Sequence, residues 1–228
     1  MEFLTRTGKP LPQSVLTSAE NAKKDPVSRR EFLAIASAFG ATSATAYGML
    51  GMAAPARAAA HANLKEGGTV RMQMEVRALK DPRTYDWSQI ANFSRGWLEY
   101  LAIWENDGTF TPGLLESWEI SDDATEYTLN VRKGVTWNDG TPFTAQDVAR
   151  NIEGWCDKSL EGNSMAGRFA TLVDEETGKA IEGAIEVVDD HRVKLKLPKS
   201  DITLIPGMAD YPAAITPEGF DPDTMLEN

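Results

Sequence analysis

The segment from Thr125 to Val148 constrains the fold of this chain more than any other. Residues 125 to 132 alternate between apolar and polar side chains, with Tyr127, Leu129 and Val131 on one face. A period of two is typical of a β-strand with one buried face. Asn138-Asp139-Gly140 then predicts a tight turn, because Asp-Gly tolerates the positive φ that such turns need. Local chemistry therefore predicts a half-buried strand that ends in a turn.

A helix is expected directly after this turn. Pro142 favours extended geometry at Thr141. Thr144 can cap the first helical turn, and Asp147 stands at the third helical position in a capping-box-like arrangement. An acidic side chain there also suits the positive end of the helix dipole. The pattern predicts a helix from residue 144 to residue 157.

The run from Leu114 to Val148 resembles the signature region of the family 5 extracellular solute-binding proteins, the peptide-, opine- and nickel-binding components of ABC importers. The matching residues are Arg132-Lys133-Gly134, Trp137, Asp139-Gly140-Thr141-Pro142-Phe143 and Asp147. Ala124 departs from the pattern, because the family often has glycine at this place. The motif is mainly scaffold, so it indicates the family without indicating the ligand.

The resemblance implies an α/β fold. Residues 61–228 would form the N-terminal portion of the first solute-binding lobe of a two-lobed periplasmic-binding-protein fold (type II, peptide-binding-like), with a mixed sheet and flanking helices. Such a protein closes two lobes around its solute. The resemblance covers only the N-terminal portion of the family, and members usually continue with a Gly-Thr-Gly-Pro segment after the position of Asn228. The lobe is therefore expected to be incomplete and the chain to be a fragment.

Residues 1–60 are interpreted as a twin-arginine signal peptide with its n-region. Ser28-Arg29-Arg30-Glu31-Phe32-Leu33 looks like the twin-arginine translocation motif, with Ala34 where lysine is common. A modestly apolar stretch follows up to Ala54, and small-x-small patterns at 56–58 and 58–60 predict cleavage near residues 58–60. An uncleaved anchor or a chance arginine pair is the alternative. Because no cysteine follows the small-residue site, a soluble periplasmic protein is expected rather than a lipoprotein.

The charge distribution supports this division. Residues 1–60 carry 7 Lys/Arg and 4 Asp/Glu, a net charge of +3, whereas residues 61–228 carry 16 and 30, a net charge of −14; together they give −11. An acidic segment argues against nucleic acid as a partner, since binding there depends on Lys and Arg that neutralise phosphates. Solubility is the simplest reason for the acidity.

Further elements are expected along the chain. Val70 to Val76 alternates like a strand after Gly67-Gly68, and the loop 77–87 would end near the ligand cleft. Apolar residues at helical spacing predict a helix from Ser88 to Leu101. The remaining expectations are a turn at 106–108, a short strand with Trp118 and Ile120 in the core, an exposed turn at 174–178, a hairpin of 184–188 with 192–197, and an irregular tail from Asp201.

Enzymes are a rival class, because twin-arginine export often serves cofactor-loaded oxidoreductases. His61 and His191 are the only histidines and Cys156 is the only cysteine, so no metal-ligand spacing is present. The run 162–166 misses the nucleophile-elbow pattern, and no phosphate-binding glycine loop with lysine occurs. The sequence thus predicts no catalytic residues, no metal and no cofactor. A sensory or docking protein on the same fold remains open.

The predicted function is a periplasmic solute-binding component of an ABC importer, which delivers its solute to the transmembrane permease subunits. Pockets of this kind favour aromatic walls with a few polar groups. The residues predicted to contact solute are Glu75, Arg77, Tyr85, Arg95, Trp97 and Trp155. Arg77 could hold a carboxylate and Glu75 a peptide amino group; each of the six could instead serve the core or the surface. A di- or oligopeptide is the leading solute, with nickel complexes, opines and sugars open.

Replacement of Arg29 and Arg30 by lysine tests the export interpretation. The double variant is expected to stay in the cytoplasm, because the arginine pair is the part of the motif that the twin-arginine translocase would recognise. Cell fractionation followed by immunoblotting measures this. Arrival of the double variant in the periplasm would show that the twin-arginine assignment is wrong.

Overall fold

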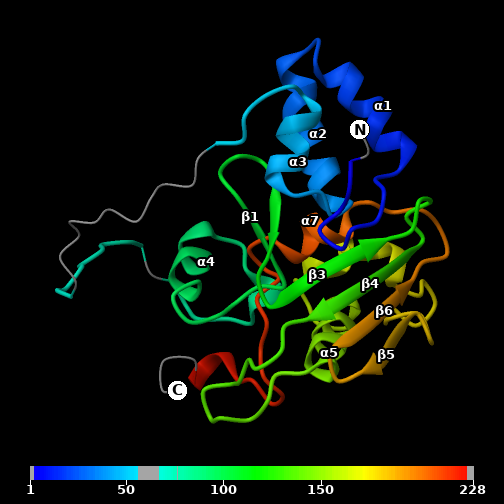
Figure 1. The fold of residues 1–228 in the computed structure, drawn as a ribbon. Helices are drawn as coiled ribbons and strands as arrows, with labels where there is room; N and C mark the ends of the chain where they lie inside the picture. The colour runs from blue at the N-terminus through cyan, green and yellow to red at the C-terminus, as the bar shows by residue number, and fades with distance from the viewer. Residues whose placement is uncertain (1–2, 56–66, 76, 225–228) are drawn as a thin grey trace.

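The computed structural model describes residues 3–55, 67–75 and 77–224 (Figure 1). The predicted cleavage patterns near residues 58–60, His61, Val76 and the last four residues lie outside these ranges. The helices are α1 Gln13–Ala22, α2 Pro26–Ala38, α3 Ser43–Met49, α4 Ser88–Ser94, α5 Ala145–Cys156, α6 Met165–Arg168 and α7 Leu204–Met208. Short 3₁₀ turns are η1 Pro82–Thr84, η2 Ala170–Leu172 and η3 Pro222–Thr224.

A four-stranded antiparallel sheet lies at the centre of the fold. Its order is β3 (Leu115–Ile120), β4 (Glu126–Val131), β6 (Arg192–Lys196) and β5 (Ile185–Asp189). In β4 the residues Tyr127, Leu129 and Val131 are buried, so the predicted face of this strand is confirmed. The α/β class is confirmed as well. The described sheet differs from the expected mixed one in being antiparallel throughout, because two hairpins, β3–β4 and β5–β6, pair with each other through β4 and β6.

Helix α5 packs behind this sheet, against β5 and β6 (Figure 1). It begins where the sequence predicts, since Asp147 Oδ2 accepts a hydrogen bond from the backbone N–H of Thr144 at 3.0 Å. Val148, Ile152 and Trp155 recur at helical spacing and are buried against the sheet. The preceding turn is also confirmed, with Gly140 at φ 87°.

A second, smaller hairpin joins this core to the tail. Strands β1 (Ala102–Trp104) and β2 (Phe110–Pro112) pair antiparallel across the predicted turn, where Gly108 has φ 84°. Ahead of β1, Tyr100 forms a bridge with Ala214 of the tail. The irregular tail is therefore anchored through residues 213–215, which are buried.

The strand predicted for Val70 to Val76 is absent from the described part of that range. Residues 67–75 form no regular secondary structure, and Val70 and Met72 are 87% and 74% exposed. A strand is stable only when a neighbour satisfies its backbone groups and covers one face. No described strand pairs with residues 67–75, so the predicted strand does not form there.

The helix predicted from Ser88 to Leu101 is also shorter than expected. Helix α4 ends at Ser94, and residues 95–98 form turns. Beyond them the backbone carbonyls of Tyr100 and Leu101 accept hydrogen bonds from Leu114 and Gly113. The chain therefore leaves the helix because tertiary pairing of its backbone outweighs the helical spacing of its apolar side chains.

The N-terminal helices take part in the structure. Figure 1 shows α1, α2 and α3 together at one end, beside β1 and β3. Their apolar side chains form a core of their own, with Val15, Phe32 and Ala46 fully buried. Residues 1–60, interpreted as a signal peptide, were expected to lie outside the fold. Their small and apolar residues nevertheless give the described residues 3–55 a face that packs on the rest of the chain.

Across the described residues, every helix falls short of the length and apolar character that a membrane span needs.

Replacement of Leu129 by alanine tests the importance of β4. Leu129 is fully buried and lies opposite both Trp118 and Val193, so its truncation leaves a cavity. The free energy of unfolding is expected to fall by about 3 kcal/mol in urea titrations. Thr128→Ala, on the other face of the same strand, is the control and should change it by less than about 1 kcal/mol. Equal effects of the two variants would contradict the assigned face.

Candidate functional site

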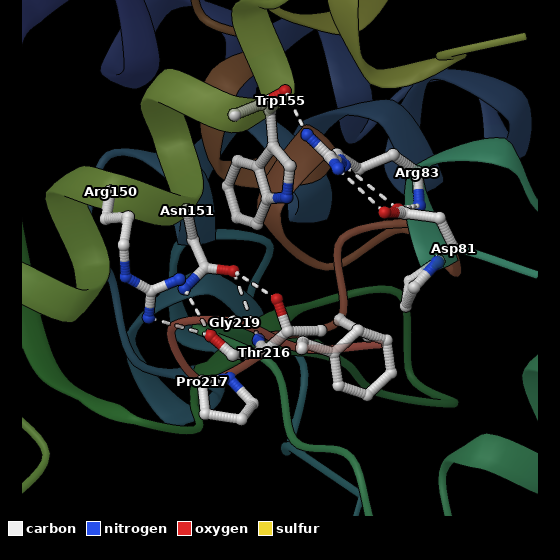
Figure 2. A pocket seen from close by; sticks show the side chains of 12 residues that line it. Asp81, Arg83, Arg150, Asn151, Trp155, Thr216, Pro217 and Gly219 are labelled. Carbon is white, nitrogen blue, oxygen red and sulfur yellow. Dashed lines mark hydrogen bonds and ion pairs between the residues drawn. The ribbon is translucent and has the colours of Figure 1, made fainter. Parts of the chain in front are cut away.

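A cavity of about 240 Å³ lies between α5, the η1 turn and the tail (Figure 2). Its wall is polar on the helix side and carries an aromatic ring at either end. The lining residues are Asp81, Pro82, Arg83, Arg150, Asn151, Gly154, Trp155, Ala214, Thr216, Pro217, Gly219 and Phe220. Three segments far apart in the sequence therefore meet here.

Asn151 fastens the tail to α5. Its Oδ1 accepts hydrogen bonds from Thr216 N at 3.1 Å and Thr216 Oγ1 at 3.3 Å. Its Nδ2 donates to Thr216 O at 3.0 Å and to Asp147 O at 2.9 Å. Arg150 adds a second bond to Thr216 O at 2.9 Å and an ion pair with Asp147 at 3.1 Å. The amide of Asn151 thus acts like a backbone partner for the tail, and it shapes the cavity floor (Figure 2).

Arg83 fixes the opposite wall. It holds Asp81 in a two-pronged pair, with Nε to Oδ1 at 2.9 Å and Nη2 to Oδ2 at 2.7 Å. Its Nη1 donates to Gly154 O at 3.1 Å, in the last turn of α5, where a cation is favoured by the helix dipole. The hydrogen bonds that Arg83 donates to Asp81 are the main reason that the pKa of Arg83 is raised. Residue 154 suits glycine, since a Cβ would lie 3.1 Å from Arg83 Nη1.

The structure does not bring the six predicted contact residues together. Only Trp155 lines this cavity, and it is almost fully buried beside Phe169, with ring centroids 5.1 Å apart. Tyr85 is buried in a small core with Ile90 and Ala91, and burial raises its pKa to about 12.

The other four predicted residues lie elsewhere. Glu75 and Arg77 are exposed and form an ion pair at 3.1 Å. Arg95 lies over the ring of Tyr100 at 5.2 Å, beside a second hollow of about 280 Å³ that Trp104 also lines. Trp97 is 38% exposed and packs edge-on against Phe93. The roles given to these residues stay predictions.

Asn151 is the residue whose role the sequence reasoning missed. It stands in the stripe formed by Val148, Ile152 and Trp155, which is the buried face of the helix. A polar side chain inside an apolar stripe is buried only when it has partners. That signal could have identified Asn151, but not its partner Thr216, which lies 65 residues further along the chain.

The cavity is lined by the hydrogen-bonding groups of Asp81, Arg83, Arg150, Asn151 and Thr216. Among the described residues no serine, cysteine or histidine lines it, and no group of three potential metal ligands occurs in the described part of the chain. Cys156 is buried next to Trp155, and burial raises its pKa to about 12, so its thiol stays protonated and unreactive at neutral pH. The volume is below the range of roughly 300–1,000 Å³ typical of pockets that enclose a whole drug-sized ligand.

Comparison with known proteins shows the family of this chain. The solved structure of the binding protein AgaA from A. tumefaciens R10, in complex with agropinic acid, has a similar fold: the TM-score is 0.52 at 24% identity, over 64% of this chain and 26% of that one. Residues 109–227, just over half of the chain, match the family model of the bacterial extracellular solute-binding proteins, family 5 Middle. The chain belongs to this family, as the signature region predicted.

Relatives in this family carry peptide-binding names. The periplasmic oligopeptide-binding protein OppA of Escherichia coli K12 is 32% identical over 133 residues, 54% of this chain and 23% of the relative. Di/tripeptide-binding protein 3 of Pseudomonas aeruginosa UCBPP-PA14 is 32% identical over 139 residues, 58% of this chain and 25% of the relative. The chain thus spans about a quarter of the length of these relatives.

Replacement of Asn151 by alanine tests the anchoring of the tail. The loss of its hydrogen bonds leaves Thr216 N and Asp147 O without this partner, so the free energy of unfolding should fall by about 1–3 kcal/mol. Hydrogen exchange at the Thr216 amide should accelerate as well. Asn130→Ala is the matched control, because its amide bonds only to Ser117 on the neighbouring strand. An unchanged Thr216 exchange rate in Asn151→Ala would contradict the anchoring role.

Proposed function

We propose that this chain is the N-terminal part of a periplasmic receptor that captures a di- or oligopeptide and delivers it to the permease of an ABC importer. The similarity to OppA and to di/tripeptide-binding protein 3 carries this proposal, since it covers more than half of the chain. In this proposal the protein binds its solute without reacting with it. The cavity wall agrees with such a role, because none of the described residues that line it is an activated nucleophile.

The small size of the cavity bears on how solute is held. With about 240 Å³, it accommodates a side chain or one end of a peptide rather than a whole peptide. Arg83 and Arg150 already pair with Asp81 and Asp147, so their charges are largely compensated inside the lobe. In this proposal most of the ligand surface is covered by parts of the receptor outside this chain, through closure of two lobes.

Export belongs to the same proposal. The twin-arginine motif at Arg29 and Arg30 supplies the route to the periplasm, and the translocase is the partner during export. The acidic composition of residues 61–228 suits a protein that stays in solution. The solute-contact roles of Glu75, Arg77, Tyr85, Arg95, Trp97 and Trp155 are part of the proposal.

Thermal stabilisation by ligand tests the proposed function. The melting temperature of the full-length protein, purified from its own cells, is measured with and without defined di-, tri- and oligopeptides. A bound peptide at 100 times its Kd contributes about 2.7 kcal/mol, so the melting temperature should rise by several degrees. The corresponding free amino acids are the control, and the 228-residue chain alone should respond less. A coloured cofactor or bound metal, with no response to any peptide, would instead indicate an oxidoreductase.

A further inference from the structure

The N-terminal segment contacts the rest of the chain through buried, directional hydrogen bonds. We call residues 3–55 the leader and residues 67–224 the body, omitting residue 76. The Phe110 backbone N–H of the body donates to Ser37 Oγ at 2.9 Å, and the Trp118 indole Nε1 donates to Ala38 O at 2.7 Å. All four residues are nearly or fully buried. Each donor left unsatisfied would cost about 1–3 kcal/mol, so these bonds fix one position of the leader on the body.

The end of α2 is built for this close approach. Gly40 has φ +88°, and the bonds from Ala41 N to Ala36 O and from Gly40 N to Ser37 O, both 2.9 Å, form a Schellman ending. A Cβ on Gly40 would meet Trp118 O at 3.5 Å and Thr5 Cβ at 3.4 Å. The glycine therefore ends the helix and turns the chain where the backbone of β3 passes alongside.

Charge and polar contacts extend the contact beyond the apolar core. Ser43 Oγ donates to Asp107 Oδ2 at 2.7 Å, Tyr47 Oη donates to Asp107 O at 3.2 Å, and Arg6 donates to Phe110 O at 3.0 Å. Lys9 of the leader also pairs with Glu119 of β3. A basic leader on an acidic body is electrostatically complementary, in line with net charges of +3 for residues 1–60 and −14 for the remainder.

The apolar half of the twin-arginine motif lies inside this contact region. Phe32 and Leu33 are 0% and 6% exposed, in the core that the leader forms with Ala124 of the body. Arg29 is half-buried and Arg30 is exposed, and both line a groove beside the 105–108 turn, which carries Glu105 and Asp107. A translocase that binds the whole motif would therefore find Phe32 and Leu33 covered while docking lasts.

We propose that the surface formed by β2, β3 and the 105–109 turn is a docking site for the leader, and that docking withholds the twin-arginine motif from the translocase until α2 detaches. The proposal rests on the export route proposed above. Body and translocase then compete for α2, so the apparent affinity of the translocase equals its intrinsic affinity multiplied by the fraction of chains in which the leader is detached. The folded body thereby sets the rate at which its own export begins.

Thiol labelling of the full 228-residue chain tests the docking. Ser37→Cys places a thiol at the buried contact, whereas Glu31→Cys places one on the exposed side of the same helix. Ser37→Cys is expected to react at least about 100-fold more slowly than Glu31→Cys. Cys156 is buried, so its protection in every variant shows that the body is folded. Equal rates at positions 31 and 37, with Cys156 still protected, would overturn the docking. Ser37→Cys itself removes the hydroxyl that accepts the bond from the Phe110 N–H. The second measurement is therefore hydrogen exchange at the Phe110 amide of the unaltered chain, which should be slow if the leader docks.

Variants of the body test separately whether the leader docks and whether docking hides the motif from the translocase, which we call masking. Trp118→Phe keeps an aromatic ring but removes the donor to Ala38 O, so labelling of Ser37→Cys should become several-fold faster. Trp137→Phe is the matched control, because Trp137 packs on Phe143 and on the main core. In pulse–chase export assays the Trp118→Phe chain should reach the periplasm at least about twofold faster than the Trp137→Phe chain. Faster labelling with unchanged export would overturn the masking. If Arg29→Lys with Arg30→Lys leaves export intact, the proposed route fails, while the labelling result still decides whether the leader docks.

Discussion

The burial of one face of β4 is the interaction on which the other elements depend. Tyr127 and Leu129 each lie opposite a residue of β3 and a residue of β6, so a single strand holds both of its neighbours in register. Its apolar side chains share one core with α5 behind the sheet. A shift by one residue would expose all of them and bury their polar neighbours, so the alternation specifies the register. The register of β4 also places β6, and β6 in turn pairs with β5.

Features that depend on nearby residues were predictable from the sequence. The 138–140 turn, the bond between Thr144 and Asp147, and the hairpin across 189–191 each need only a few neighbouring residues, and the structure contains them. The strand predicted from Val70 and the helix predicted to continue to Leu101 were wrong, because pairing with distant parts of the backbone decides whether such elements form. A local pattern shows what a segment could become, whereas a partner far along the chain determines what it does become.

The cavity illustrates the same limit. Its helical wall could be foreseen, since Asn151 interrupts an apolar stripe and so requires buried partners. Its other walls could not, because Arg83 and Thr216 reach the helix only through the tertiary fold. Of the aromatic and charged residues expected near solute, Trp155 alone lines this cavity, and the others are spread over the body. Residue type identified plausible contacts but carried no information on which of them converge.

Ala124 shows how the leader and the body constrain a single position. It has φ 53°, a left-handed conformation that costs a non-glycine residue of order 1 kcal/mol, yet its methyl group is buried against the apolar core of the leader. A larger or β-branched side chain would increase the backbone strain and would clash with the packed leader. Glycine would relieve the backbone strain but would leave the space of the methyl group empty. In a survey of all substitutions, position 124 would tolerate little besides glycine and would resemble a ligand-binding residue. Its intolerance would instead reflect backbone geometry and a contact within the chain.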